Sequence, residues 1–257
     1  MKRKFSWFVL SVIMFLTLAG SGWSQEEPCT IMRPDSETLR KWIQAYESAP
    51  KAYIVEELKF TIPLTGSYSL LDYLYYVPAE RNQGSCGNCW AWAGTGVMEV
   101  DLRRQEGILD RLSVQYNNSC GGSGANFGCC GGWLSDLADF YSSNPYKKAL
   151  PWVNHDAAWQ DGDRACGGSS NVPCADISTS PKYPIASINE TVIPTQNVGQ
   201  ATAIANIKSV LHQNKAVWFG FFMAKGSDWN NFRTFWNTQP ETTIWNPDFS
   251  CGHRWDS

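Results

Sequence analysis

The chain has 257 residues, of which 43% are hydrophobic, and its formal net charge is −3. That length allows one large domain or two small ones, and the hydrophobic content is enough for a substantial core, which excludes a disordered or fibrous chain. No long basic or acidic run lies beyond the N-terminus, so the charge pattern disfavours nucleic acid as a partner.

The first 24 residues have the pattern of a secretory signal peptide. Basic residues at positions 2–4 precede an apolar stretch over 5–19, and small residues follow. The apolar stretch is shorter than a membrane-spanning helix needs, although a retained anchor is the alternative. We predict cleavage near Gln25, no stable membrane span afterwards, and a secreted, periplasmic or extracellular location in which disulfides persist.

Residues 25–62 contain one predicted helix, which begins at Asp35 or Ser36. Four apolar residues then recur at helical spacing and share one face, namely Leu39, Trp42, Ile43 and Tyr46. Residues 62–81 alternate turn residues with aromatic residues, which predicts an extended, half-buried segment.

The stretch over 81–104 carries two cysteines and a glutamine ahead of a long apolar run. The run predicts a mostly buried helix with Cys89 in its first turn and basic residues in its last. Unpaired backbone N–H groups and the positive end of the helix dipole at that turn favour a thiolate, and so a nucleophile. Gln83 lies six residues earlier on a glycine-containing loop, where its amide can donate to a developing oxyanion.

The second half of the chain is richer in loops. Residues 143–194 are rich in Pro, Gly, Ser and Asp and include Cys166 and Cys174, which predicts a disulfide-pinned loop region of undetermined connectivity. Residues 203–211 predict a helix, and the apolar run over 216–223 has the length of a strand.

The sequence at the nucleophile resembles the papain-like cysteine peptidases, whose active-site stretch reads Gln-Gly-Ser-Cys-Gly-Ser-Cys-Trp. The matching stretch is Gln83-Gly84-Ser85-Cys86-Gly87-Asn88-Cys89-Trp90, which departs only at Asn88. The resemblance implies that Cys89 is the nucleophile, Gln83 the oxyanion-hole donor and Cys86 a half-cystine. It implies an α+β fold with a helical half around the nucleophile helix and a β-barrel-like half that we expect to be incomplete.

A second stretch, Cys129-Cys130-Gly131-Gly132-Trp133, resembles the family's Cys-Asn-Gly-Gly followed by an aromatic residue. The resemblance implies that Cys129 pairs with Cys86, that the two glycines offer an open backbone edge to an extended substrate, and that Trp133 lines a specificity pocket. Glycines suit such an edge because a peptide backbone can approach them closely. By the same resemblance, 25–62 is a short propeptide-like segment and 63–257 the peptidase domain; an N-terminal helix that completes the domain is the alternative.

The catalytic base is the weak point of the resemblance. A cysteine nucleophile needs an imidazole to take its proton. His155 and His212 are read as surface or packing residues, while His253 is late enough but is not followed by the family's apolar strand. We expect the chain to lack the C-terminal part of the domain, with His253 or a residue beyond Ser257 as base, and to have little peptidase activity alone.

Nine cysteines, an odd number, predict one free thiol, which we assign to Cys89. The other eight are available for pairing: Cys29, Cys86, Cys120, Cys129, Cys130, Cys166, Cys174 and Cys251. The expected function is a cysteine endopeptidase that acts on proteins or peptides and uses no metal or organic cofactor; the oligomeric state stays open. The alternatives are an inactive papain-like binding protein, a thiol-disulfide oxidoreductase using the Cys-x-x-Cys of Cys86 and Cys89, and a weaker zinc site formed by Cys86, Cys89, Cys129 and Cys130.

Overall fold

The computed structural model describes residues 36–61, 68–220, 226–240, 243 and 245. The chain divides into a large unit, Pro34–Phe221, and a small unit made of its two ends. The small unit contributes one described helix, α7 (Gly226–Thr238), in which Phe232 packs on the ring of Trp236. The predicted signal peptide, Cys29, Cys251 and His253 lie outside the described residues.

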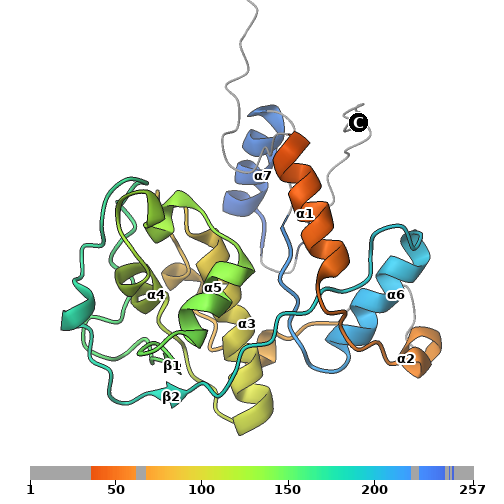
Figure 1. Cartoon of the computed structure of the whole chain (residues 1–257), viewed down its shortest axis with the longest axis horizontal. Helices are drawn as coiled ribbons and strands as arrows, with labels where there is room; N and C mark the ends of the chain where they lie inside the picture. Colours follow the sequence, from red (N-terminus) through yellow and green to blue (C-terminus); the bar gives the residue numbers. More distant parts are fainter. Residues whose placement is uncertain (1–35, 62–67, 221–225, 241–242, 244, 246–257) are drawn as a thin grey trace, which may run out of the picture. The chain divides into compact units, whose positions relative to one another are not determined.

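The large unit is mostly helical (Figure 1). Its α-helices are α1 (Ser36–Ser48), α2 (Glu56–Thr61), α3 (Cys89–Glu106), α4 (Val114–Cys120), α5 (Leu134–Ser142) and α6 (Gln200–Leu211). Short 3-10 turns are η1 (Leu71–Tyr73), η2 (Pro78–Glu80), η3 (Gly124–Asn126), η4 (Gly128–Cys130) and η5 (Cys174–Asp176). Strands β1 (Lys148–Ala149) and β2 (Tyr183–Pro184) pair antiparallel, with Lys148 opposite Pro184. Three predicted helices are confirmed: the one that begins at Asp35 or Ser36, the one that begins at Cys89 and the one over 203–211.

Helix α3 is the longest described helix, and its 18 residues correspond to roughly 27 Å. It ends where Gly107 takes a left-handed conformation (φ 71°) and donates its backbone N–H to the Arg103 carbonyl. A residue without Cβ adopts that conformation at little cost. Arg103 and Arg104 occupy the last turn, as predicted, where the negative end of the helix dipole stabilises their positive charge.

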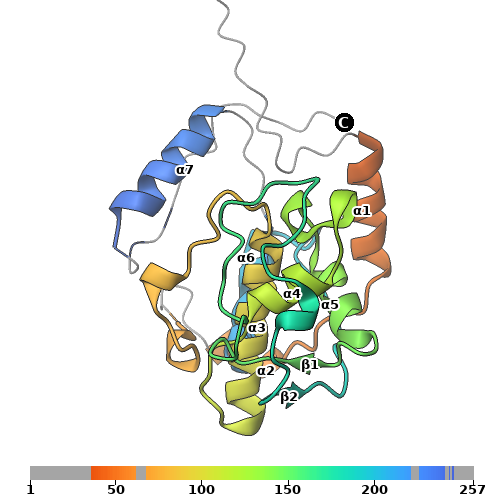
Figure 2. The same cartoon turned by 90° about the vertical axis from the view of Figure 1, so that its left-hand side faces the viewer.

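The core lies where α4 and α5 pack against α3 (Figures 1 and 2). Gly94 makes the approach of α5 to α3 possible, because a Cβ there would lie 2.4 Å from Leu137 Cδ2. The buried cluster comprises Trp90, Ala91, Val114, Tyr116, Leu137, Phe140, Tyr141, Leu150, Ala157, Val172 and Ile177. Helix α3, which carries Cys89, is therefore held by the buried cluster of the large unit.

Helices α1 and α2 are tied to the chain around α6. The Tyr46 hydroxyl on α1 donates to the Ile193 carbonyl at 3.1 Å, and Val55 N, just before α2, donates to Ser209 Oγ on α6 at 2.9 Å. Trp42 and Tyr46 are half-buried on the predicted face of α1, whereas Ile43 is exposed. The predicted face is therefore correct only in part.

The expected β-rich half is not found in the described residues. β1 and β2 are two residues each, and the run predicted as a strand over 216–223 has no strand in its described part, 216–220. A strand needs a hydrogen-bonding neighbour, and none of the described segments pairs with this run. Within 68–81, η1 and η2 interrupt the predicted extended segment at residues 71–73 and 78–80. Residues 143–194 are the disulfide-pinned loop region predicted.

Candidate active site

Cys89 is the first residue of α3, is exposed, and is the free cysteine of the described residues, as predicted. Burial raises the pKa of its thiol, and the backbone N–H groups of Trp90 and Cys89 oppose this only in part. The residue reaches solvent, yet the surrounding protein still desolvates a charge on the sulfur. The direction of this shift is opposite to the predicted preference for a thiolate.

Gln83 is half-buried on the loop before α3, and its Nε2 donates to the Cys86 carbonyl at 2.8 Å. An amide nitrogen carries two N–H groups, so the second remains for another acceptor. The loop is pressed against residue 162: Ser85 N donates to the Gly162 carbonyl at 2.7 Å, and Gly84 has φ 67° with that oxygen 2.1 Å from the position of a Cβ. No residue with a side chain fits at position 84 without a local shift.

An ion pair that the sequence analysis missed joins this loop to α3. Arg81 Nη2 lies 2.6 Å from Glu99 Oε2 on α3, and Leu112 N donates to Glu99 Oε1 at 2.9 Å. Glu99 is 2% exposed, and burial raises the pKa of its carboxyl while Arg81 acts in the opposite direction. An acidic residue among the apolar residues of a predicted buried helix was the signal available in the sequence.

A second network holds the loop that carries Gly162. The fully buried Asp161 carboxylate accepts hydrogen bonds from Gln115 Nε2 at 2.8 Å, Asn118 Nδ2 at 2.6 Å and Asn171 N at 2.6 Å. Three donors replace the water that the charge loses on burial. Asp161 therefore acts on the Gln83 loop through the backbone contact of its neighbour.

Three disulfides occur among the described residues. They are Cys86–Cys129, which is the pairing that the family resemblance implies, Cys120–Cys174 and Cys130–Cys166. Because Cys86 is bonded to Cys129, it is not the redox partner of Cys89, and the oxidoreductase interpretation loses its Cys-x-x-Cys pair. The zinc interpretation is wrong, because three of its four cysteines are bonded, and no metal-ligand cluster occurs among the described residues.

The two predicted edge glycines differ in what they require. Gly131 is exposed, has φ 93°, and leaves open space at its Cβ position. Gly132 is half-buried, and a Cβ there would lie 2.6 Å from the Trp90 ring. Trp133 is half-buried between two other indoles, with ring centroids 4.3 Å from Trp42 on α1 and 6.2 Å from Trp218.

No imidazole meets Cys89 in the described part of the chain. His155 is 80% exposed at its side chain and pairs with Asp156 at 3.0 Å, while His212 follows α6 and stacks on Tyr68 at 4.2 Å. His253 lies outside the described residues. The site as described supplies a thiol and an amide donor.

Comparison with known proteins identifies the family to which the chain belongs. Residues 72–228, more than half of the chain, match the papain family cysteine protease model. The chain belongs to the papain family of cysteine proteases.

The curated relatives match over a shorter stretch. Cathepsin L 1 and cathepsin L 2 of Paramecium tetraurelia are each 36% identical over 72 residues, which cover 28% of this chain and 23% of theirs. Cathepsin K of Mus musculus is 34% identical over 84 residues, 32% of this chain and 25% of its own. The matched stretch thus spans about a quarter of the length of these relatives.

Among solved structures, the digestive procathepsin L 3 of the Tenebrio molitor larval midgut aligns over 68% of this chain and 50% of its own. The sequence identity is 22% and the TM-score 0.35. None of the described helices is long and apolar enough to cross a membrane.

Proposed function

We propose that this protein is a cysteine endopeptidase that hydrolyses peptide bonds in proteins, with Cys89 as its nucleophile. The observation that carries the proposal is the free, exposed thiol at the first residue of a well-packed helix, with the Gln83 amide on the preceding loop. Membership of the papain family supports the reaction class.

The proposed chemistry is acyl transfer through the Cys89 sulfur. The thiolate attacks the peptide carbonyl carbon, and the free N–H of Gln83 Nε2 and the Cys89 backbone N–H stabilise the oxyanion. The tetrahedral intermediate collapses to a thioester as the amine leaves with a proton from the base. Water then attacks the thioester and regenerates the thiol. None of these steps needs a metal or an organic cofactor.

The proposed mechanism needs a base for the Cys89 thiol. Because burial raises the pKa of Cys89, a nearby imidazole must take its proton before attack at neutral pH. His253 is the histidine left once His155 and His212 have been assigned other surroundings.

Gly131, Gly132 and Trp133 are proposed to bind the substrate. The exposed backbone at Gly131 is open to an extended peptide, and Trp133 offers an aromatic wall. Trp42 of α1 packs on that wall, which supports assigning residues 25–62 as a propeptide-like segment that occupies the substrate side. Active protein whose N-terminus lies at or before Glu26 would argue against a removable segment.

The three disulfides are consistent with an oxidising compartment, and we propose that the protein is exported. Fractionation of the producing cells would show whether the protein leaves the cytoplasm.

The direct test is hydrolysis of a quenched fluorescent protein substrate by the full chain. We expect weak cleavage, which Cys89→Ala abolishes and the matched control His212→Ala leaves unchanged. Robust cleavage that is lost in His253→Ala would assign the base to His253 and overturn the expected weak activity. A His253→Ala variant with full activity would exclude His253 as the base. No cleavage, together with normal binding of a peptide to the intact site, would favour the inactive binding protein instead; the absence of a base near Cys89 in the described residues is the observation on its side.

A further inference from the structure

Two asparagines of the chain begin the acceptor motif for N-linked glycans, which is Asn-x-Ser/Thr with x other than proline. The motif occurs at Asn117 as Asn-Asn-Ser and at Asn189 as Asn-Glu-Thr. A glycan is bulky and hydrated, so a folded protein can carry it only at the surface. The surroundings of each asparagine in the fold therefore decide whether its motif can be used.

The motif at Asn117 is buried. Asn117 is 3% exposed on α4, a helix that packs against α3. The serine of the motif, Ser119, is already bonded: its hydroxyl accepts from Gln115 Nε2 at 2.9 Å and lies 2.8 Å from Ser170 Oγ. The same Gln115 nitrogen donates to the buried Asp161 carboxylate. A sugar on the Asn117 amide would separate α4 from its neighbours, so the folded protein cannot carry a glycan there.

The motif at Asn189 lies at the surface. Asn189, Glu190 and Thr191 are all exposed, on the connection from β2 to α6, which has neither helix nor strand at these positions. The Asn189 amide donates to the Ser187 hydroxyl at 3.3 Å, a long hydrogen bond between two exposed side chains. The Asn189 Nδ2 can therefore bond a sugar without any change in the packing.

The backbone on both sides of Asn189 is anchored, which fixes the asparagine at this exposed position. Ile188, directly before it, packs against the buried cluster. Three residues after it, Val192 N donates to the Pro50 carbonyl and the Val192 carbonyl accepts from Ala52 N, both at 2.9 Å. None of these contacts uses the Asn189 side chain, so a glycan would leave them intact.

We propose that Asn189 is a site of N-linked glycosylation and that Asn117 is not. The proposal rests on the proposed export of the protein, because the transferase acts on chains that cross the export membrane. The Asn189 Nδ2 attacks the anomeric carbon of a lipid-phosphate-linked oligosaccharide. A new N–C bond replaces the bond from that carbon to the phosphate oxygen, the phosphate leaves with its lipid, and Nδ2 loses one proton. The transfer involves neither oxidation nor reduction.

The test is cell-free translation of the full chain with microsomes from a secretory cell, followed by added protease. Protection from the protease reports entry into the lumen, and a gel shift that an endoglycosidase reverses reports the glycan. Among chains that have formed disulfides, separated on a non-reducing gel, we expect one glycan per chain. A protected chain without a glycan would overturn this proposal and leave the export proposal standing. Complete digestion would overturn both, and two glycans on the disulfide-bonded chain would overturn the exclusion of Asn117.

Variants locate the glycan. Asn189→Gln removes the acceptor nitrogen and Thr191→Ala removes the hydroxyl of the motif, so each should abolish the shift, whereas the conservative Thr191→Ser should keep it. Asn117→Gln should leave the shift unchanged. A shift that survives Asn189→Gln, or that is lost in Asn117→Gln, would overturn the assignment.

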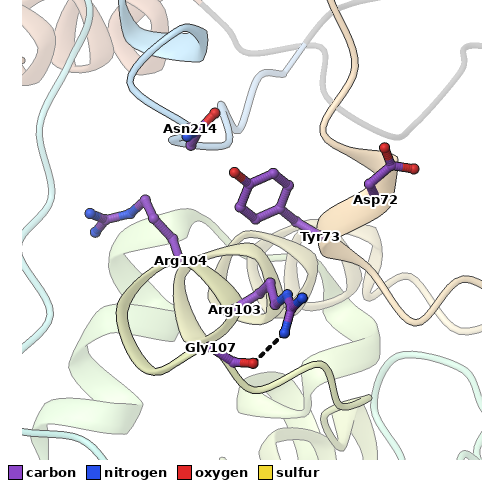
Figure 3. Close-up of a pocket in the computed structure, with 6 residues that line it drawn as sticks. All are labelled: Asp72, Tyr73, Arg103, Arg104, Gly107 and Asn214. Carbon is purple, nitrogen blue, oxygen red and sulfur yellow. Dashed lines mark hydrogen bonds between the residues drawn. The ribbon is translucent and has the colours of Figure 1, made fainter.

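An engineered motif provides the matched control. Arg104, Gln105 and Glu106 are all exposed at the end of α3, where Arg104 lines a hollow (Figure 3). Arg104→Asn with Glu106→Thr creates Asn-Gln-Thr there and should restore one glycan to the Asn189→Gln chain. The exposed ion pair lost between Arg104 and Asp101 contributes little to stability. A glycan on this control, with none on the parent chain, would show that the transferase acts on this chain and does not use Asn189, which would overturn the proposal.

Discussion

Replacing Gly132 by alanine tests whether this glycine is needed for packing. The new Cβ would lie 2.6 Å from Trp90 Cε2 and 2.8 Å from Cδ2, well inside the about 3.5–4 Å of ordinary contact. The ring cannot withdraw freely, because Trp90 is 6% exposed and its Nε1 donates to the Gly128 carbonyl at 3.1 Å. Overpacking costs about 1–3 kcal/mol and a lost hydrogen bond about 1 kcal/mol, so we expect a loss of about 2–4 kcal/mol.

Thermal and urea unfolding measure this loss. Each kcal/mol lowers the Tm of a domain of this size by about 2–4 °C, so Gly132→Ala should melt roughly 5–15 °C below the parent. Gly96→Ala on α3 is the matched control, because a Cβ there meets nothing within 4 Å. Within a helix that change should stabilise by about 0.5–1 kcal/mol, which gives the two variants opposite signs.

A Gly132→Ala protein that melts with the parent would refute the packing explanation. The Trp90 ring would then be able to give way, and the glycine would have to be explained by the approach of a substrate backbone. Loss of stability in both variants would show instead that alanine is poorly tolerated in this region for reasons unrelated to the ring.

Three further predictions concern the thiol, a buried carboxylate and a disulfide. Iodoacetamide reacts with the thiolate, and burial raises the pKa of the Cys89 thiol. The pH midpoint of alkylation, followed by peptide mapping, should therefore lie above the pKa of free cysteine, about 8.5. A midpoint below about pH 7 would reveal an imidazole partner. Asp161→Ala leaves three donors without their acceptor and should lower the free energy of unfolding in urea by on the order of 3–5 kcal/mol. The control Asp176→Ala, at an exposed residue, should lower it by under about 0.5 kcal/mol, and similar urea midpoints for the two variants would contradict the role of the network. Replacing both Cys130 and Cys166 by serine opens a bridge across 36 residues and should cost about 4 kcal/mol by chain entropy, which an unchanged guanidinium midpoint would exclude.

The elements that the sequence predicted well are those whose signal is local. The helix from Cys89 is marked by its apolar run and by its basic last turn, and both features hold in the structure. The position of Cys89 in the first turn followed from the same pattern. Its pKa did not, because desolvation depends on the surrounding protein rather than on the helix that carries the residue.

The features that escaped prediction depend on partners distant in sequence. Cys120 and Cys130 each bond a cysteine in the loop region, and spacing alone leaves many pairings open. The run over 216–223 has the composition of a strand, but composition does not supply a neighbouring strand. The pairing of Arg81 with Glu99 likewise required knowing that the loop before α3 folds back onto that helix.

The adjacent cysteines 129 and 130 determine whether the fragments stay together when a protease cuts the chain. They bond in two directions, one to the segment before α3 and the other to the loop at 166, so three distant stretches of chain meet at one covalent junction. A single cut anywhere between 87 and 128, or between 131 and 165, leaves both fragments attached. Cleaved molecules should therefore migrate as one species on a non-reducing gel and separate only after reduction, and the protein can be cut in its loops without losing the pieces that surround Cys89.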